Sequence, residues 1–243
     1  MSQGPTTKGL TLFQSMKIAP SILSANLMEL GRELAMMEEA GAQWVHVDVM
    51  DGHFVPNLTF GVPLVRQLAA ATALPLDVHL MVGNPLEQLP WYLEAGAYSV
   101  TVHVEACAEG ELPRAIEAIH EAGAKAAAAI KPATPVGTLA PVLSMLDMVL
   151  VMSVEPGFSG QSYIPSSAVK VAHVVELARE QGASPLIEVD GGIGVETAPL
   201  VAAQGADVLV CGNAVFAAMD PAQAIAAVGA SGDGARRSAM TSL

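Results

Sequence analysis

One phrase recurs along the chain and limits the folds that it can adopt: a helical pattern ends, Gly-Ala follows, and a short aliphatic run comes next. Glycine reaches the left-handed backbone conformation that ends a helix without a Cβ clash, so each copy predicts a helix, a stop and a buried strand. The pairs are Gly41-Ala42, Gly96-Ala97, Gly123-Ala124, Gly182-Ala183 and Gly205-Ala206. Strands that alternate with helices in this way indicate βα units and a parallel sheet.

Three further aliphatic runs complete a set of eight predicted strands. The strands are Ile18–Leu23, Trp44–Val49, Leu76–Met81, Ser99–Val104, Ala126–Ile130, Met148–Ser153, Leu186–Val189 and Val208–Cys211. The alternating helical segments are Leu27–Glu39, Val62–Ala71, Leu86–Ala95, Leu112–Ala122, Val136–Leu143, Ser166–Gln181, Thr197–Ala203 and Ala222–Val228.

Eight βα units in 243 residues match a closed barrel, which needs about 250 residues. An open doubly wound sheet is the alternative, but no G-x-G-x-x-G follows the first predicted strand. We therefore expect an α/β fold, a single (β/α)8 TIM barrel with eight parallel strands. Along the chain we expect a flexible extension over residues 1–16, the barrel domain over 17–228 and a flexible tail over 229–243.

Composition excludes several classes of protein. Hydrophobic residues make up 52% of the chain and charged residues 14%, the reverse of a disordered protein. A net charge of −13 argues against binding to nucleic acid or to an anionic membrane surface. No apolar run approaches the ~20 residues of a spanning helix. Two cysteines are too few for a disulfide framework, so we expect a cytoplasmic protein.

Polar side chains lie near the ends of three predicted strands. His46 and Asp48 share one face of their strand because side chains alternate, and His79 and Asp190 lie late in two others. A barrel interior is normally filled by Val, Ile and Leu, and burying His or Asp there costs free energy unless it is paired or binds metal. Each residue alone is more typical of a hydrogen-bonded core group. The four together predict a divalent cation site for Zn, Fe, Mn or Co.

Glycine-rich loops follow the sixth, seventh and eighth predicted strands. They contain Gly157-Phe158-Ser159-Gly160, Gly191-Gly192 and Gly212-Asn213. Small residues let backbone N–H groups approach an anion closely, and the barrel fold commonly binds phosphate after its last strands. We expect a phosphate cradle here, with the loop after the sixth strand as a lid.

Other residues near the predicted mouth have two interpretations each. Met50, Met81 and Met152 are typical of adaptable core packing, and would equally form an apolar collar that excludes water. Ser21 could hydrogen-bond a sugar hydroxyl. His103 and Glu105 could form another polar pair, although such groups are more often satisfied within the core.

Five phrases carry a resemblance to a known family. They are Ala19–Ala25, His46–Asn57, Asp77–Val82, Val151–Phe158 and Val189–Ile193. From about Lys17 to Ala227 the chain resembles the ribulose-phosphate 3-epimerases. That resemblance implies a TIM barrel that interconverts D-ribulose 5-phosphate and D-xylulose 5-phosphate in the pentose phosphate pathway. It also implies one divalent metal ion and a homo-oligomer.

The resemblance also assigns roles. It implies that His46, Asp48, His79 and Asp190 are metal ligands, and that Asp48 and Asp190 are the acid and base. It implies that substrate contacts come from Ser21, His79, Gly157, Phe158, Ser159, Gly160, Asp190, Gly191, Gly192, Gly212 and Asn213. Ser159 and Asn213 depart from the family pattern, which usually has Gly and Ser there, so phosphate affinity or lid closure could differ.

Several alternatives stay open on the sequence. The first is a sister epimerase acting on a hexulose phosphate such as allulose 6-phosphate. The second is a decarboxylase or aldolase, which usually needs a lysine at a strand end. Lys131 follows the fifth strand, but it stands in Ile130-Lys131-Pro132, which the family also shows. The third is a non-catalytic barrel. The presence of both Asp48 and Asp190 argues against it. We expect a sugar phosphate as the small-molecule partner, and no organic cofactor, nucleic acid or membrane.

Overall fold

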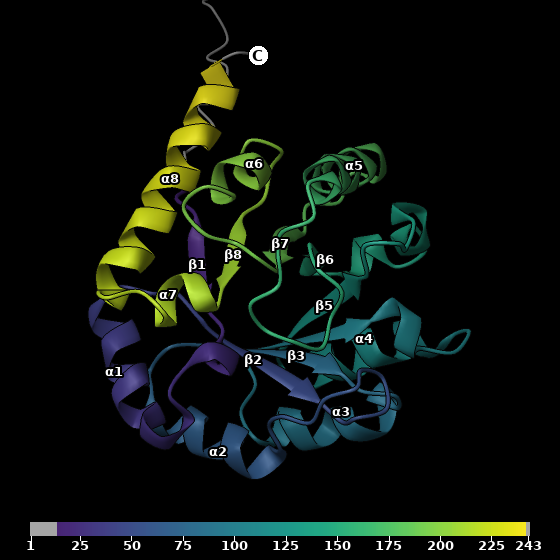
Figure 1. The fold of residues 1–243 in the computed structure, drawn as a ribbon. Coiled ribbons are helices and arrows are strands. Elements are labelled where there is room, and N and C mark those ends of the chain that lie inside the picture. Colours follow the sequence, from purple (N-terminus) through teal and green to yellow (C-terminus); the bar gives the residue numbers. More distant parts are fainter. Residues whose placement is uncertain (1–13, 242–243) are drawn as a thin grey trace, which may run out of the picture.

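A barrel of parallel strands forms the centre of the molecule, and helices surround it (Figure 1). The computed structural model describes residues 14–241. Within that range the strands are β1 (Lys17–Pro20), β2 (Val45–Met50), β3 (Leu76–Met81), β4 (Ser99–His103), β5 (Lys125–Ile130), β6 (Met148–Met152), β7 (Leu186–Asp190) and β8 (Val208–Cys211). Their order in the sheet is β1-β8-β7-β6-β5-β4-β3-β2. An isolated parallel bridge between Ser21, which follows β1, and His46 of β2 brings the two ends of this order together and closes the barrel. The predicted TIM-barrel fold is confirmed.

The helices of the described range alternate with the strands. They are α1 (Leu30–Glu39), α2 (Val62–Ala71), α3 (Pro85–Glu94), α4 (Glu111–Glu121), α5 (Ser166–Gln181), α6 (Ala198–Ala202), α7 (Asn213–Phe216) and α8 (Pro221–Thr241). The helix predicted over Val136–Leu143 is replaced by two 3₁₀ turns, Val136–Leu139 and Leu143–Met145. Gly137 and Pro141 explain the difference, since both residues disfavour a continuous α-helix. The short α7 was not predicted.

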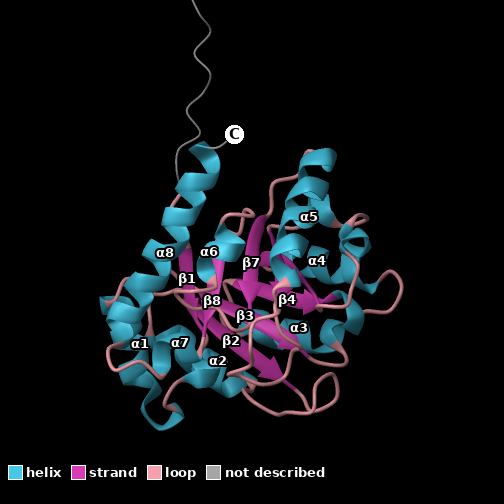
Figure 2. Cartoon of the chain, turned by 45° about the horizontal axis from the view of Figure 1, so that its top comes forward, coloured by secondary structure: helices cyan, strands magenta, loops and turns pink. Residues whose placement is uncertain are grey.

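Helix α8 differs from the loose tail expected after residue 228. It continues to Thr241 and extends beyond the barrel (Figure 2). Asp233 accepts a hydrogen bond from the Met16 amide at 2.7 Å, and Arg236 Nη2 lies 2.6 Å from Asp207 Oδ1. A Cβ at Gly232 would lie 2.9 Å from Met16 Cγ, so this glycine permits close packing rather than marking a flexible segment. The predicted extension over residues 1–16 lies mostly outside the described residues.

The two faces of β2 show how the barrel separates apolar from polar side chains. Val45, Val47 and Val49 belong to the large core between strands and helices. His46 and Asp48 alternate with them, are also buried, and project into the barrel. Other polar groups buried at the strands are Asp77, His79, Ser99, Thr101, His103 and Glu188. These residues come from β3 and β4 and, across the barrel, from β7, so part of the barrel interior is polar.

Among residues 14–241, no helix is both long enough and apolar enough to cross a membrane.

Candidate metal and active site

Four side chains from three strands converge at one end of the barrel interior. His46 and Asp48 come from β2, His79 from β3 and Asp190 from the end of β7. Each offers one potential ligand atom, and these atoms all lie within 4.8 Å of one another. In the register of β2 and β3, Asp48 is the partner of His79 and His46 is the partner of Asp77. The residues that the sequence singled out therefore form one cluster.

The contacts of His46 determine which of its ring nitrogens carries a proton. Nδ1 lies 2.6 Å from Asp77 Oδ2, and Asp77 Oδ1 accepts a hydrogen bond from Ser99 at 2.6 Å. A carboxylate can only accept, so Nδ1 carries the hydrogen. Nε2 is buried without a hydrogen-bond partner among the described residues and lies 3.4 Å from Asp48 Oδ1. A buried nitrogen that has no hydrogen-bond partner and faces a carboxylate offers a position for a metal ion between the two.

His79 faces the same cluster with its other nitrogen. Its Nδ1 lies 3.2 Å from Asp48 Oδ1 and 3.9 Å from Asp190 Oδ2. Its Nε2 lies 2.9 Å from Nε2 of His103, which is fully buried. The four donors, two imidazole nitrogens and two carboxylates, are the set that Zn²⁺, Fe²⁺, Mn²⁺ or Co²⁺ accepts.

The charges in this cluster affect each other strongly. Burial opposes a charge on His46, but the carboxylates of Asp48 and Asp77 raise its pKa well above the usual value. Burial likewise opposes a charge on Asp48, but His46 and His79 hold its pKa well below the usual range. Burial and then the negative charge of Asp48 raise the pKa of Asp190 to about 6. The cluster therefore attracts positive charge, and its two carboxyl groups differ in how readily they take a proton.

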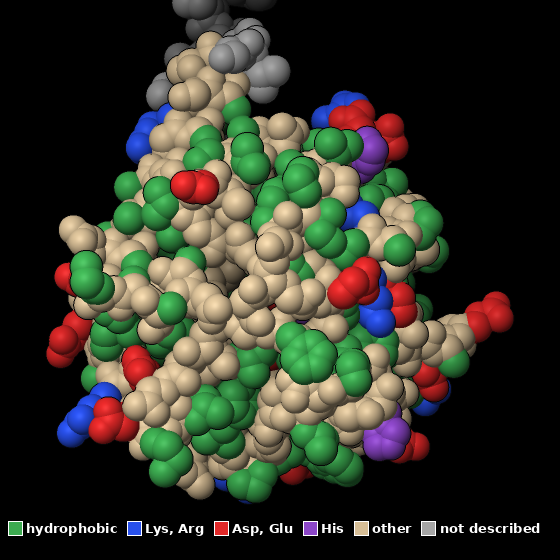
Figure 3. Space-filling view, in the orientation of Figure 1, with side chains coloured by type: hydrophobic (Ala, Val, Ile, Leu, Met, Phe, Trp, Pro, Cys, Tyr) green, Lys and Arg blue, Asp and Glu red, His purple; other side chains and the backbone are tan. Residues whose placement is uncertain are grey.

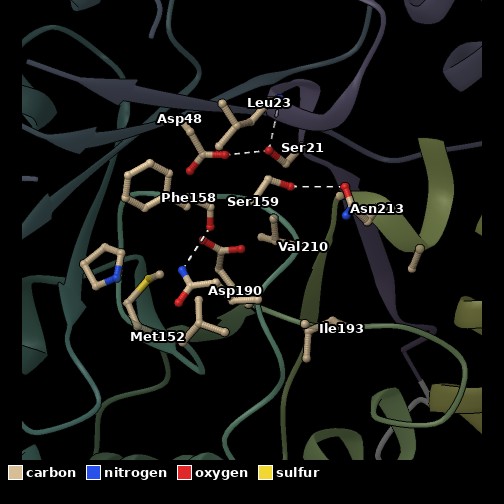
Figure 4. Close-up of a pocket in the computed structure, with 18 of the residues that line it drawn as sticks. Ser21, Leu23, Asp48, Met152, Phe158, Ser159, Asp190, Ile193, Val210 and Asn213 are labelled. Atoms are coloured by element: carbon tan, nitrogen blue, oxygen red, sulfur yellow. Dashed lines mark hydrogen bonds between the residues drawn. The ribbon is translucent and has the colours of Figure 1, made fainter. Parts of the chain in front are cut away.

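A cavity of about 350 Å³ adjoins the carboxylate side of the cluster (Figure 4). Asp48 and Asp190 both point into it, and Ser21 donates a hydrogen bond to Asp48 Oδ2 at 2.5 Å. Met50, Met81 and Met152 line it and are almost fully buried. Their burial fits both interpretations of these residues, as core packing and as an apolar wall beside the polar cluster.

The other side of the cavity is formed by the three glycine-rich loops. Gly191 and Gly192 have φ values of +120° and +64°, which residues with a Cβ rarely adopt. A Cβ at Gly192 would lie 2.6 Å from the backbone nitrogen of Tyr163, so the loop after β7 touches the end of the loop after β6. Figure 3 shows this face of the molecule, where Lys and Arg lie away from the central hollow. An anion at this end of the cavity would therefore meet backbone N–H groups.

The predicted lid lines the cavity and forms hydrogen bonds with the segments after β1, β2 and β8. Asn57 Nδ2 donates to the Gly157 carbonyl at 2.9 Å. The hydroxyls of Ser24 and Ser159 lie 2.5 Å apart, and Ser159 donates to Asn213 Oδ1 at 3.3 Å. Ser159 and Asn213, the two residues that depart from the family pattern, are thus in contact. Phe158 lines the cavity and is 55% exposed.

Some buried polar residues of the site were not predicted to take part in it. Asp77 supports His46, and Glu188 lies beside both, with its ligand atom within 4.8 Å of theirs. Burial and the charge of Asp77 raise the pKa of Glu188 well above its usual value. Strand alternation is the signal that could have found them, because Asp77 precedes His79 by two residues and Glu188 precedes Asp190 by two.

Comparison with known proteins gives the family. Residues 17–216 match the model of the ribulose-phosphate 3 epimerase family. The chain belongs to this family.

Curated relatives of this family cover most of the chain. The ribulose-phosphate 3-epimerase of Treponema pallidum is 49% identical over 84% of this chain and 92% of its own length. That of Bacillus subtilis is 47% identical, with coverages of 87% and 97%. The chloroplastic ribulose-5-phosphate-3-epimerase of Arabidopsis thaliana is 47% identical, with coverages of 88% and 76%. This last relative shows that the family is not confined to the cytoplasm.

Solved structures confirm the fold. A 3-hexulose-6-phosphate synthase from Salmonella typhimurium superposes with a TM-score of 0.65 at 20% sequence identity, over 92% of this chain and 100% of that one. A tryptophan synthase α-subunit from Pyrococcus furiosus gives a TM-score of 0.60 at 15% identity, over 93% and 95%. At these identities the likeness concerns the fold alone.

Proposed function

We propose that this protein is a metal-dependent epimerase that interconverts D-ribulose 5-phosphate and D-xylulose 5-phosphate at C3. The observation that carries the proposal is the placement of two carboxyl groups, Asp48 and Asp190, at one cavity beside two histidine nitrogens. The family match and the names of the relatives support the same reaction.

In this proposal one divalent ion is held by His46 Nε2, His79 Nδ1 and an oxygen each from Asp48 and Asp190. Zn, Fe, Mn and Co all accept this donor set. When bound, the ion supplies Lewis-acid stabilisation of negative charge on the oxygens at C2 and C3. The buried, unpartnered Nε2 of His46 supports this assignment, because such an atom costs free energy unless something binds it.

Asp48 and Asp190 then move the proton. The C3–H bond lies next to the C2 ketone and is acidic for that reason. Inversion at C3 requires removal of the proton from one face and delivery of a proton to the other, so one carboxyl group must start ionised and the other protonated. Because the two groups interact strongly, their titrations belong to the pair. Ser21, which donates to Asp48, would orient that carboxylate.

The loops of the cavity would bind the phosphate and exclude water. Backbone N–H groups near Gly191, Gly192, Gly212 and Gly160 would meet the anion, which is how an acidic chain can bind an acidic substrate. Phe158 and the three methionines would shield the reacting carbons from solvent.

The competing functions have less support. The relatives named above are all called ribulose-phosphate or ribulose-5-phosphate 3-epimerases, so they give no support to a hexulose-phosphate epimerase. A lysine-dependent decarboxylase or aldolase would need Lys131 at the substrate. Instead Lys131 Nζ lies 3.9 Å from the centre of the Phe54 ring, and Lys131 is not among the described residues that line the cavity. The cytoplasmic location and the homo-oligomer stay predictions of the sequence.

Conversion of D-ribulose 5-phosphate in deuterated water tests the proposal. NMR would follow C3 with and without a strong chelator. We expect D-xylulose 5-phosphate with deuterium at C3, and loss of the activity when the metal is removed. With metal present, absence of product and of exchange would refute the pentulose assignment, and allulose 6-phosphate would then be assayed. Full activity in metal-depleted enzyme would refute the metal site.

A further inference from the structure

Behind His79 a chain of hydrogen bonds leads away from the proposed metal site to the loop after β5. His79 Nε2 lies 2.9 Å from His103 Nε2, and His103 Nδ1 lies 3.1 Å from Glu105 Oε2. The other carboxylate oxygen of Glu105 accepts from the Lys131 amide at 2.7 Å and from the hydroxyl of Thr134. None of His103, Glu105 or Thr134 lines the cavity among the described residues, so none of them is placed to touch substrate.

The chemistry of each group determines which atom donates and which accepts in each of these hydrogen bonds. A carboxylate only accepts hydrogen bonds, so the Glu105 end requires a hydrogen on His103 Nδ1. At the other end, a metal on His79 Nδ1 requires the hydrogen of that ring to be on Nε2. His79 Nε2 then donates to His103 Nε2, which must accept. Both ends impose the same arrangement, in which each histidine is neutral.

The surroundings hold this chain in place. His103 is fully buried, and its ring packs against Phe54 with the ring centres 4.8 Å apart. Lys170, from α5, donates to the carbonyls of Lys131, Pro132 and Thr134 at 2.6–2.9 Å, which fixes the loop that binds Glu105. The loop thus has a structural reason to keep its shape although it supplies no ligand.

We propose that His103 and Glu105 are positioning residues that fix His79 in the tautomer whose Nδ1 is free to bind the metal ion. The inference rests on the metal site of the proposed function and extends it to residues that contact neither metal nor substrate. Outer hydrogen bonds of this kind orient a histidine ligand and raise its basicity.

Glu105→Gln is the most specific test, because it reverses the donor and acceptor roles along this series of hydrogen bonds instead of only removing one bond. The Lys131 amide can only donate, so the Gln oxygen would face it and the Gln NH₂ group would face His103 Nδ1. His103 Nδ1 would then have to accept, and the hydrogen of His79 would move from Nε2 to Nδ1, where the metal should be. We expect Zn²⁺ affinity, measured by competition with a chromophoric chelator, to fall about 10- to 100-fold.

Glu111→Gln is the matched control. Glu111 accepts a hydrogen bond from the Ala108 amide at 2.9 Å in the segment after β4, which also carries Glu105, and it takes no part in the hydrogen bonds behind His79. A Gln oxygen can keep that bond, so we expect the Zn²⁺ affinity of the wild type. Long-range ¹H–¹⁵N NMR spectra report the tautomer of His79 directly. We expect hydrogen on Nε2 in Zn-loaded wild type, and hydrogen on Nδ1 in Glu105→Gln.

A second pair of variants keeps the inference testable if Glu105→Gln does not fold. In His103→Gln the amide can accept from His79 and donate to Glu105, so we expect Zn²⁺ affinity within a few-fold of wild type. In His103→Leu the chain is cut, and affinity should fall. Equal affinity of wild type and Glu105→Gln, or equal loss in both His103 variants, would overturn the positioning role alone. Absence of Zn²⁺ binding in wild type would overturn the metal site itself, and this inference with it.

Discussion

Replacing Gly192 by alanine tests the proposed phosphate cradle at the glycine that lies closest to the backbone of another loop. Gly192 has φ +64°, and an added Cβ would lie 2.6 Å from the Tyr163 nitrogen, 2.9 Å from its Cα and 3.0 Å from the Gln161 carbonyl oxygen. All three are backbone atoms, so no side chain can rotate away. The loop after β7 and the end of the lid would have to separate.

The structure supplies a control with the same backbone strain and no contact. Gly182, at the end of α5, has φ +66°, and a Cβ there meets nothing within 4 Å. Left-handed backbone costs a residue with a Cβ roughly 1–2 kcal/mol, and overpacking adds about 1–3 kcal/mol. We therefore expect Gly182→Ala to lose about 1–2 kcal/mol and Gly192→Ala about 2–5 kcal/mol in the free energy of unfolding. In a domain of this size 1 kcal/mol lowers Tm by about 2–4 °C, which calorimetry can resolve.

Kinetics separate the cradle from stability. Loss of one hydrogen bond to a charged group costs about 1.5–3 kcal/mol, so Gly192→Ala should lower kcat/KM for D-ribulose 5-phosphate by about 10- to 150-fold. Gly182→Ala should keep wild-type kinetics at 25 °C, and both variants should keep wild-type Zn²⁺ affinity. If Gly192→Ala lost stability but kept the wild-type kcat/KM, our reasoning about the cradle would be wrong.

Three further predictions concern other parts of the molecule. Asp48→Asn and Asp190→Asn should each fold, as circular dichroism would show, yet lose deuterium incorporation at C3; wild-type exchange in either variant would contradict the acid–base pair. Ser159→Gly removes the contacts of the lid with Ser24 and Asn213, so steady-state assays should give a KM raised about 2- to 12-fold, and an unchanged KM would show that these contacts do not contribute to binding. Arg236→Ala breaks the ion pair of α8 with Asp207 and should lower Tm by about 3–12 °C with activity at 25 °C retained; an unchanged Tm would show that α8 adds no stability through this pair.

Local patterns in the sequence determined the architecture. The helix–glycine–strand phrase repeats within each βα unit, and both the left-handed glycine and the aliphatic run depend on neighbours in the chain. The predicted strand Leu76–Met81 and helix Ser166–Gln181 agree with the structure to the residue. The four residues of the cluster could also be predicted from the sequence. Strand alternation and the common edge of a parallel barrel bring together His46, Asp48, His79 and Asp190.

The tertiary structure decided which partners those residues have. The register of β2 against β3 sets Asp77 beside His46, and the distance between His79 and His103 depends on how β3 and β4 pack. In the same way, the contact of Ser159 with Asn213 joins segments 54 residues apart, and Gly232 of α8 proved to be a packing position because Met16 lies against it. Hydrogen bonds between distant segments follow from their placement in space, and a local pattern carries no signal for that placement.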